Sequence, residues 1–235
     1  VIIYNCKYQD KTIFISEFGK KIISKNRLLM NNSIVISHAI SPVFFEIGES
    51  NLIQGFDEKK YLLYVSSFLP YKNHANLIKS YAKVKSKLGG IKLIMIGKIS
   101  KSTKSKLDNL INKLNISNEA MILEEVNQIG LASCYQKSLF NIFLSSCENC
   151  PNIMLESMAS SRPLLSSIKD PMPEFGKDYV TYCDPTNIND ISEKLIYMKK
   201  NISALEGKAL LGKENITDKK GWDRVANKTL EFISS

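Results

Sequence analysis

The sequence predicts an α/β fold with a doubly wound parallel sheet. Short apolar runs, typical of strands buried on both faces, recur at Tyr61–Val65, Lys92–Ile96 and Phe140–Leu144. A stretch with helical periodicity follows each run, and glycine or proline marks many of the connections. Strands that alternate with helices in this way form βαβ units. The chain has 235 residues, of which 44% are hydrophobic, so it can bury a substantial core.

The first elements form a short βαβ pattern of their own. A strand is predicted over Lys11–Ser16, a helix over Glu17–Arg27 and a second strand over Ser33–Ser37. Residues 46–60 are polar and contain glycine, which is typical of a linker.

The main sheet follows the linker. After the strand Tyr61–Val65, the expected elements are a helix from about His74 to Lys87, a strand over Lys92–Ile96, a helix from about Lys101 to Leu114, a strand over Met121–Leu123, a helix over Asn127–Lys137 and a strand from Phe140. Two glycines, Gly89 and Gly90, end the first of these helices, because glycine readily adopts the left-handed conformation of a helix terminus. The second half continues with a helix that begins near Pro151, a strand over Leu164–Ser166, a turn over Pro171–Glu174, a strand over Val180–Tyr182 and a helix from about Ile188 to Asn201.

The most informative segment is 145–165, SSCENCPNIMLESMASSRPLL. Two acids, Glu148 and Glu156, flank seven residues across a predicted strand-to-helix turn. Pro151 suits the first turn of a helix, where its missing N–H is not needed. Free backbone N–H groups and the positive end of a helix dipole would then lie beside two carboxylates. This arrangement can hold a phosphate and a polyol together.

The segment resembles the acid-x7-acid signature of the family-4 (group 1) retaining glycosyltransferases, which have the GT-B fold with Rossmann-like domains. The matching residues are Glu148, Asn149, Pro151, Asn152, Glu156, Met158 and Ala159. The resemblance implies that Glu156 binds the ribose hydroxyls of a nucleotide-sugar and that Glu148, with a catalytic role, lies by the donor sugar. An ionised carboxylate accepts hydrogen bonds only, so it can take both hydroxyls of a ribose diol.

Further segments carry the resemblance along the chain. Residues 64–73, YVSSFLPYKN, resemble the family's phosphate loop, so Lys72 is expected to contact the donor diphosphate and to act as a catalytic charge in place of a metal. Ser67 stands where many members carry an arginine, and Ser66 where glycine is usual.

The family's other donor contacts fall on three further places. The resemblance assigns Gly97 a close approach to the nucleotide, Val126 (with Glu125) the base, and the backbone at Pro151, Asn152 and Ile153 the leaving diphosphate. No metal and no cofactor besides the nucleotide-sugar substrate are expected.

The resemblance also implies a domain organisation. Residues 1–45 would be the end of an N-terminal acceptor domain, 46–60 a linker, 61–205 the nucleotide-sugar domain, and 206–235 a tail whose helix, near Trp222, crosses back to the first domain. Most of an acceptor domain is expected to be missing from this chain. His38 matches a hinge-side loop and is interpreted as structural.

Charge and cysteine content restrict the other function classes. The net charge is +9, but 29 of the 32 basic residues are lysine, which argues against sequence-specific nucleic-acid binding because base reading favours arginine. Cys147 and Cys150 have the spacing of a redox pair, an alternative to their role as turn residues. The other three cysteines are scattered singly, which disfavours a disulfide scaffold or a structural zinc site and indicates a reducing compartment.

The sequence therefore predicts the donor-binding part of a retaining, metal-independent glycosyltransferase. Its partners would be a nucleoside-diphosphate sugar and a glycan or lipid-linked glycan acceptor, in the synthesis of a bacterial surface polysaccharide. It would be cytoplasmic, with peripheral contact to the inner face of the membrane as an option. Three alternatives stay open: a nucleotide-sugar binding module or half of a two-chain enzyme, a lysine-rich protein that binds nucleic acid or anionic membrane, and a sugar-nucleotide epimerase.

Overall fold

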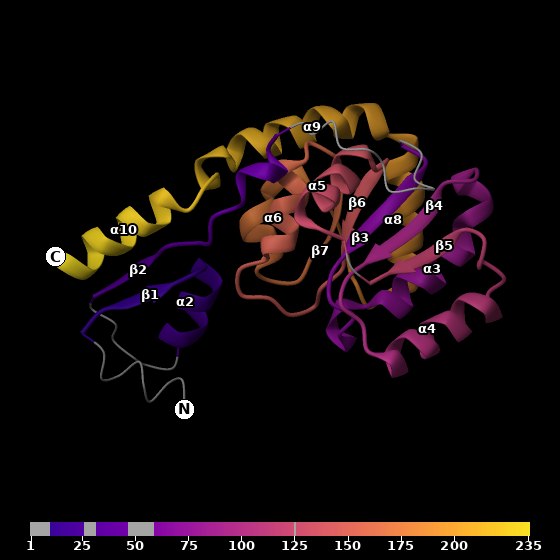
Figure 1. Ribbon diagram of the computed structural model, residues 1–235, viewed down its shortest axis with the longest axis horizontal. Helices are drawn as coiled ribbons and strands as arrows, with labels where there is room; N and C mark the ends of the chain where they lie inside the picture. The colour runs from indigo at the N-terminus through magenta and orange to yellow at the C-terminus, as the bar shows by residue number, and fades with distance from the viewer. Residues whose placement is uncertain (1–9, 26–31, 47–58, 125) are drawn as a thin grey trace.

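The computed structural model describes residues 10–25, 32–46, 59–124 and 126–235. It contains two separate parallel sheets (Figure 1). The small one pairs β1 (Thr12–Phe14) with β2 (Ser33–Val35), and α2 (Glu17–Ser24) follows β1. The predicted strands and helix of this unit are confirmed in shorter form, while the residues beyond Lys25 and the predicted linker, apart from its ends, lie outside the described residues.

The large sheet has six parallel strands in the order β5-β4-β3-β6-β7-β8. Its strands are β3 (Tyr61–Val65), β4 (Lys92–Ile96), β5 (Ala120–Leu123), β6 (Phe140–Phe143), β7 (Leu164–Ser167) and β8 (Thr181–Cys183). The order runs outward from β3 in one direction and from β6 in the other, which is the doubly wound, Rossmann-like topology. The predicted α/β fold class is confirmed.

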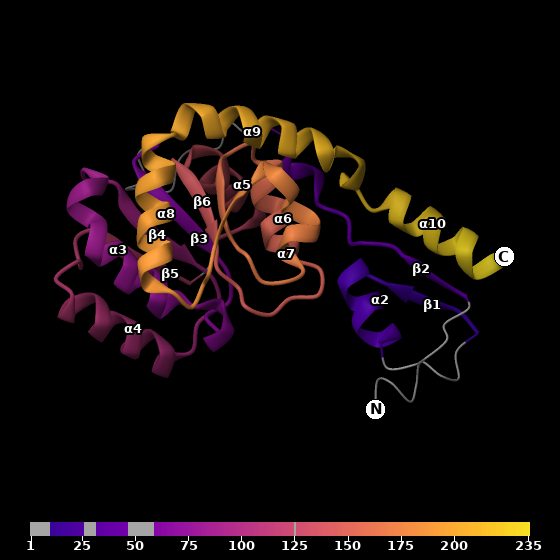
Figure 2. The ribbon, with the colours of Figure 1, turned by 180° about the vertical axis from the view of Figure 1, so that it is seen from behind.

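Helices cover both faces of this sheet. The helices that follow β3 in the chain are α3 (His74–Leu88), α4 (Lys101–Lys113), α5 (Gln128–Lys137), α6 (Asn152–Ala159), α7 (Met172–Gly176), α8 (Ile188–Lys200) and α9 (Ile202–Asn215), and α10 (Asp223–Ser234) extends away from the large sheet. Viewed from behind, α8 lies across the sheet with α3 beside it (Figure 2), and these two helices pack on each other. On the other side, α6 packs on α9, and α5 packs on the 3₁₀ turn Pro42–Phe44. Every residue of β3 and β6 is buried between these layers.

The C-terminal helices connect the two sheets. α9 runs over the top of the large sheet and α10 returns to β1 and β2 (Figure 1). The Lys11 ammonium donates to the carbonyl oxygens of Phe232 and Ile233, at 2.8 and 2.9 Å. Around the crossing point, Ile40 and Lys220 form an isolated parallel bridge. The C-terminal helix α10 therefore lies beside the first unit.

Two elements differ from the prediction. A turn was predicted over Pro171–Glu174, but residues 172–176 form the short helix α7. The helix α9 was not predicted as a separate element, and it contains the predicted domain boundary between residues 205 and 206.

Gly97 lies at the end of β4, where the main chain passes very close to the end of β3. Its φ is +153°, and a Cβ atom there would lie 2.0 Å from the carbonyl oxygen of Ser66. A side chain would therefore push β3 and β4 apart at their carboxyl ends.

We expect Gly97→Ala to lower the free energy of unfolding by about 3 kcal/mol, because both backbone strain and a steric overlap must be relieved. Urea denaturation of wild type and Gly97→Ala measures this loss. Gly90→Ala is the matched control, since φ at Gly90 is also positive, +79°, but nothing lies within 4 Å of the place that an alanine Cβ would take. If Gly97→Ala costs no more than Gly90→Ala, the close approach at Gly97 is not a constraint on the fold.

Candidate nucleotide-sugar site

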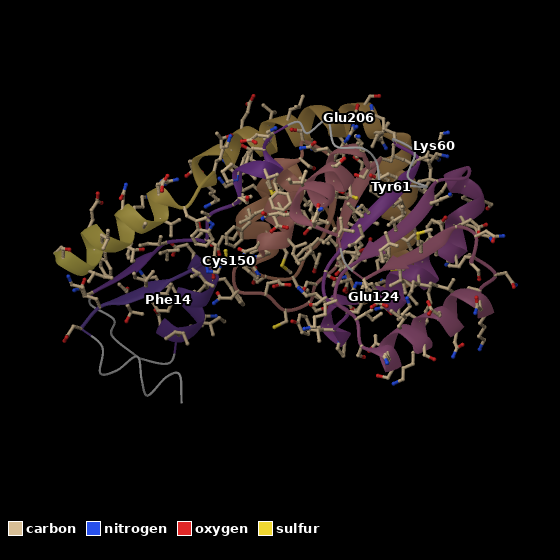
Figure 3. All side chains as sticks on the ribbon, in the orientation of Figure 1. Phe14, Lys60, Tyr61, Glu124, Cys150 and Glu206 are labelled. Carbon is tan, nitrogen blue, oxygen red and sulfur yellow. The ribbon has the colours of Figure 1, made fainter. Side chains whose placement is uncertain are left out.

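The candidate site lies where β3 and β6 diverge. These strands are neighbours in the sheet, yet the chain leaves them in opposite directions. Such a switch point leaves a crevice at the carboxyl ends of the strands, where ligands of open α/β sheets bind. Figure 3 shows this edge of the sheet: Glu124, just after β5, lies at the opposite end from Tyr61, which begins β3. Lys72 and Glu148 follow β3 and β6.

Lys72 and Glu148 form an ion pair across the switch point. The Lys72 side chain is 6% exposed and that of Glu148 is 16% exposed, so both charges are largely removed from water. The ammonium also lies 5.3 Å from the ring centroid of Tyr71 and 5.2 Å from that of Phe143, distances at which a cation interacts with an aromatic face. The structure therefore brings together the two residues predicted to be catalytic.

The loop that carries Lys72 is fastened to the segment that carries Glu148. The Asn73 side-chain amide donates to the Leu144 carbonyl oxygen at 2.8 Å and to Ser146 Oγ at 2.7 Å. The Ser146 N–H donates in return to the Tyr71 carbonyl oxygen at 2.8 Å. Asn73 has φ +58°, a left-handed conformation that asparagine tolerates better than most residues. These bonds hold the two loops at a fixed separation.

His74 packs against the loop that carries Lys72, a role that the sequence analysis did not predict. Its ring stacks between Tyr64 and Phe68, with centroid distances of 4.6 and 4.0 Å. Its Nε2 lies 3.1 Å from Ser66 Oγ, so the serine that replaces a usual glycine has a hydrogen-bonding partner. Burial and then the nearby Lys72 charge lower the pKa of His74 from 6.5 to about 3, which keeps the ring neutral. The aromatic residues Tyr64 and Phe68, close to His74 in the sequence, were the signal from which this packing role could have been predicted.

The helix α6 starts four residues after Glu148. Among the described residues, no side chain caps its N-terminus, which begins directly after Pro151. The first N–H groups of a helix have no partner within it and favour a negative charge. Asn152, the first helical residue, has its Oδ1 atom 3.1 Å from His38 Nδ1. The His38 ring is also tilted against that of Trp222, with centroids 6.1 Å apart, so this histidine joins α6 to the crossing segment.

Gly97 and Val126 line one cavity of about 460 Å³ beside the switch point. Its walls are Val65, Ile96, Gly97, Lys98, Glu124, Val126, Asn127 and Leu131. The aliphatic members can contact a flat ring, and the polar ones offer hydrogen bonds at its edge. Ser67, half-buried, follows Ser66 at the approach to Gly97, and its backbone nitrogen would lie 3.3 Å from a Cβ atom there. Glu125 lies outside the described residues.

Glu156, on the second turn of α6, is a carboxylate in a poorly solvated place. Burial raises its pKa from 4.5 to about 7, an effect that the nearby Tyr135 hydroxyl partly opposes. The Tyr135 hydroxyl is itself buried and has no hydrogen bond of ordinary geometry within the described part of the chain. A ligand that donates hydrogen bonds to Glu156 would therefore stabilise its ionised form.

This raised pKa gives a stability prediction with a definite sign. Because the folded pKa lies above the unfolded one, the neutral carboxyl's stabilising contribution is present below pH 4.5 and is lost as pH rises through about 7. We expect wild type to lose about 3 kcal/mol relative to Glu156→Gln between pH 4.5 and 8. Urea denaturation of both proteins across this range measures the difference, and the contribution of His74 cancels between them. A difference that does not change with pH would contradict the shifted pKa.

Other ligand types have less support in the described residues. No group of three or more His, Cys, Asp or Glu side chains there could hold a metal ion. Cys147 and Cys150 are free thiols, as are the buried Cys134 and Cys183. No helix in the described ranges is both long and apolar enough to cross a membrane.

Comparisons with known proteins agree with this fold. Residues 49–207 match the family model described as glycosyl transferases group 1. An uncharacterized glycosyltransferase of Methanocaldococcus jannaschii is 28% identical over 178 residues, which cover 70% of this chain and 41% of that protein.

Solved structures are similar along nearly the whole chain. HepE of Anabaena, in complex with UDP and glucose, has a TM-score of 0.85 at 12% identity, with 97% of this chain and 64% of that one covered. TarM of S. aureus, in complex with fondaparinux, alpha-GlcNAc-glycerol and UDP, has a TM-score of 0.78 at 22% identity, with 100% and 46% covered. These structural likenesses establish a common fold, and the chain spans only about half to two thirds of such proteins.

Proposed function

The chain belongs to the family of glycosyl transferases group 1, and we propose that it is the nucleotide-sugar-binding part of a retaining, metal-independent glycosyltransferase. The observation that supports this most strongly is the buried Lys72–Glu148 ion pair at the switch point, beside an α6 N-terminus that no described side chain caps. One buried cation and the N-terminus of a helix suit a diphosphate, and a carboxylate suits a sugar. The Asn152 N–H donates to the Cys150 carbonyl oxygen at 2.9 Å, so the diphosphate would have to displace this bond to reach it.

The donor would lie along the carboxyl ends of the strands. The base would enter the cavity of Gly97 and Val126, with Ser67 beside it. The ribose hydroxyls would donate to Glu156. The diphosphate would lie between Lys72 and the backbone N–H groups around Asn152 and Ile153. The sugar would then reach Glu148, whose carboxylate would accept hydrogen bonds from its hydroxyls.

In the proposed reaction, the bond between the anomeric carbon and the diphosphate oxygen breaks. Its electron pair leaves with the diphosphate, and an acceptor hydroxyl forms the new glycosidic bond while releasing its proton. Negative charge grows on the leaving diphosphate, so the Lys72 ammonium and the N-terminus of α6 would stabilise the transition state more than the ground state. This is the work that a divalent metal performs in other transferases.

We further propose a division of the chain. Residues 1–45 would be the end of an acceptor-binding domain, 61–205 the donor domain, and 206–235 the crossing tail. The acceptor would be a glycan or lipid-linked glycan of a bacterial surface polysaccharide. Because the chain spans 41% of the Methanocaldococcus jannaschii relative, a second proposal is that it holds a nucleotide-sugar without transferring it.

The test is calorimetric titration of the chain with UDP, GDP, ADP and their common sugar conjugates, with a chelator present. Saturable binding of one nucleotide series is expected and would identify the base. Binding that appears only when a divalent metal is added would refute the metal-independent part. If no member of the panel binds, donor binding by this chain is wrong. Hydrolysis of the sugar conjugate in the same mixtures, or transfer of its sugar when a glycan acceptor is added, distinguishes an enzyme from a binding module.

A further inference from the structure

The N-terminus of α2 is held by a side chain from the other unit. The Glu174 carboxylate, on α7, accepts hydrogen bonds from the Glu17 N–H and the Phe18 N–H, both at 2.9 Å. Each oxygen of the carboxylate takes one of the two bonds. A carboxylate at this end of a helix also interacts favourably with the helix dipole. Glu174 is therefore a bidentate cap supplied from 156 or more residues away.

The third N–H of α2 is connected through hydrogen bonds to the segment that carries Glu148. The Gly19 N–H donates to Ser16 Oγ at 2.9 Å, and this hydroxyl donates to Asn149 Oδ1 at 2.7 Å. Ser16 is fully buried. A Cβ atom at residue 19 would lie only 2.6 Å from Asn149 Oδ1, so α2 contacts this amide closely. Asn149 is the neighbour of Glu148 in the chain.

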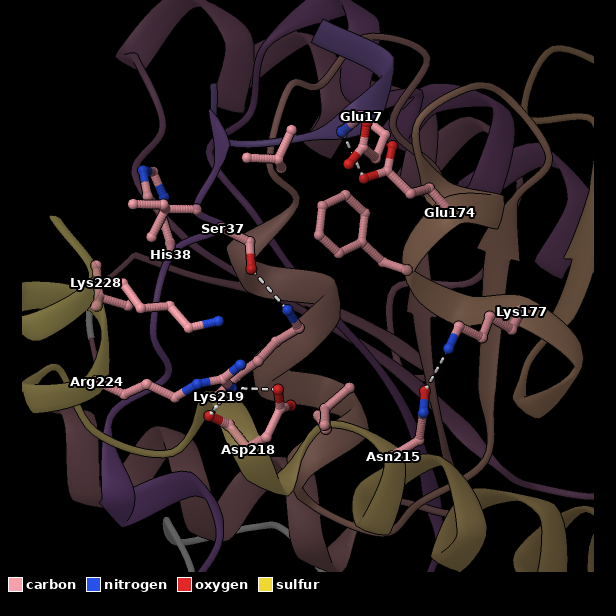
Figure 4. Close-up of a pocket in the computed structure, with 15 residues that line it drawn as sticks. Glu17, Ser37, His38, Glu174, Lys177, Asn215, Asp218, Lys219, Arg224 and Lys228 are labelled. Atoms are coloured by element: carbon pink, nitrogen blue, oxygen red, sulfur yellow. Dashed lines mark hydrogen bonds and ion pairs between the residues drawn. The ribbon is translucent and has the colours of Figure 1, made fainter. Parts of the chain in front are cut away.

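Little apolar packing reinforces this junction. None of the residues of α2 is buried. A cavity of about 430 Å³ lies beside it, with Glu17, Glu174 and Phe175 among its lining residues. Figure 4 shows the side chains of Glu17 and Glu174 together at one side of this cavity, with Arg224 and Lys228 on another. The hydrogen bonds of Glu174 and Ser16 therefore carry much of the contact between α2 and the donor-binding unit.

We propose that Glu174 is a positioning residue: it anchors α2 so that Ser16 and Gly19 fix Asn149, and through it the orientation of Glu148. This inference rests on the proposed function, since it assigns Glu148 to the donor sugar. Glu174 touches neither the ion pair nor the cavity of Gly97. Its loss should therefore affect recognition of the sugar and leave recognition of the nucleotide unchanged.

The anchor is tested by amide hydrogen exchange of Glu174→Ala. We expect the amides of Glu17 and Phe18 to exchange at least about 10-fold faster, and those of residues 147–150 to exchange faster as well. Glu193→Ala, at an exposed glutamate of α8, is the charge-matched control and should change neither group. Unchanged exchange at residues 147–150 would overturn the proposal, whether or not the chain binds a nucleotide.

The positioning role is tested by two affinities: that of the bare nucleoside diphosphate and that of its sugar conjugate. In Glu174→Ala, the first should change less than about 2-fold, and the second should fall about 5- to 10-fold. Gly19→Ala, which places a methyl group against Asn149, should give the same pattern, and the double variant should bind the sugar conjugate no more weakly than either single variant.

An equal loss of affinity for both ligands, or a loss for neither, would show that Glu174 supports the fold and does not position Glu148. Failure of wild type to bind either ligand refutes the proposed function, and the exchange result still decides the anchor.

Discussion

Replacing Glu156 with alanine is expected to weaken binding of a nucleoside-diphosphate sugar by about 100-fold. The carboxylate would accept two hydrogen bonds from the ribose diol, and a hydrogen bond to a charged group contributes about 1.5–3 kcal/mol. The burial that raises the pKa of Glu156 also excludes the water that could replace the side chain. Calorimetric titration of wild type and variant measures the loss.

The same residue should make the affinity depend on pH. The ionised carboxylate is the form that accepts both bonds, and its pKa of about 7 places the change near neutrality. Affinity for the sugar conjugate, whose phosphates do not titrate there, should rise about 10-fold from pH 6 to pH 8. Glu156→Gln should remove this dependence, and Glu193→Ala should preserve it. An affinity that falls with pH, or a Glu156→Ala variant within about 2-fold of wild type, would contradict the ribose contact.

Replacing Lys72 with methionine is expected to lower the affinity for the diphosphate by about 30-fold and the free energy of unfolding by about 2 kcal/mol. The first effect follows from losing the charge that would meet the diphosphate. The second follows because the Glu148 carboxylate, 16% exposed, is left without its partner.

A double variant separates these two effects. Lys72→Met combined with Glu148→Gln removes the unpaired charge, so it should recover stability without recovering affinity. Lys79→Met, at an exposed lysine of α3, is the matched control and should change neither quantity. If Lys72→Met binds the diphosphate as tightly as the control does, Lys72 is a structural residue only.

Local sequence patterns predicted the sheet well because its strands are buried on both faces. Tyr61–Val65 and Lys92–Ile96 are short apolar runs that have few alternatives to a central strand, and both form strands with the predicted bounds. The helix after Pro151 was equally clear from its apolar face. α9 was missed as a separate element because only one of its buried residues, Leu205, is large and apolar, while the others, Ala209 and Gly212, are small and give a weak apolar signal. Gly212 is required to be small by Tyr179, since a Cβ atom at residue 212 would lie 3.0 Å from that of Tyr179.

Sequence motifs select the candidate site residues but not the contacts between them. The residues at 72 and 148 could be selected by motif, but their ion pair joins positions 76 residues apart and depends on the order of β3 and β6. The raised pKa of Glu156 arises from burial, which no local spacing reports. The Glu174 anchor likewise exists only because α7 and α2 meet in space.

The most direct test of the account is a crystal structure of this chain with the nucleoside-diphosphate sugar that binds it. We predict the diphosphate between the Lys72 ammonium and the N-terminus of α6, the ribose hydroxyls on the Glu156 carboxylate, and the base in the cavity of Gly97 and Val126. A nucleotide bound away from the β3–β6 switch point, with Lys72 and Glu156 untouched, would contradict it.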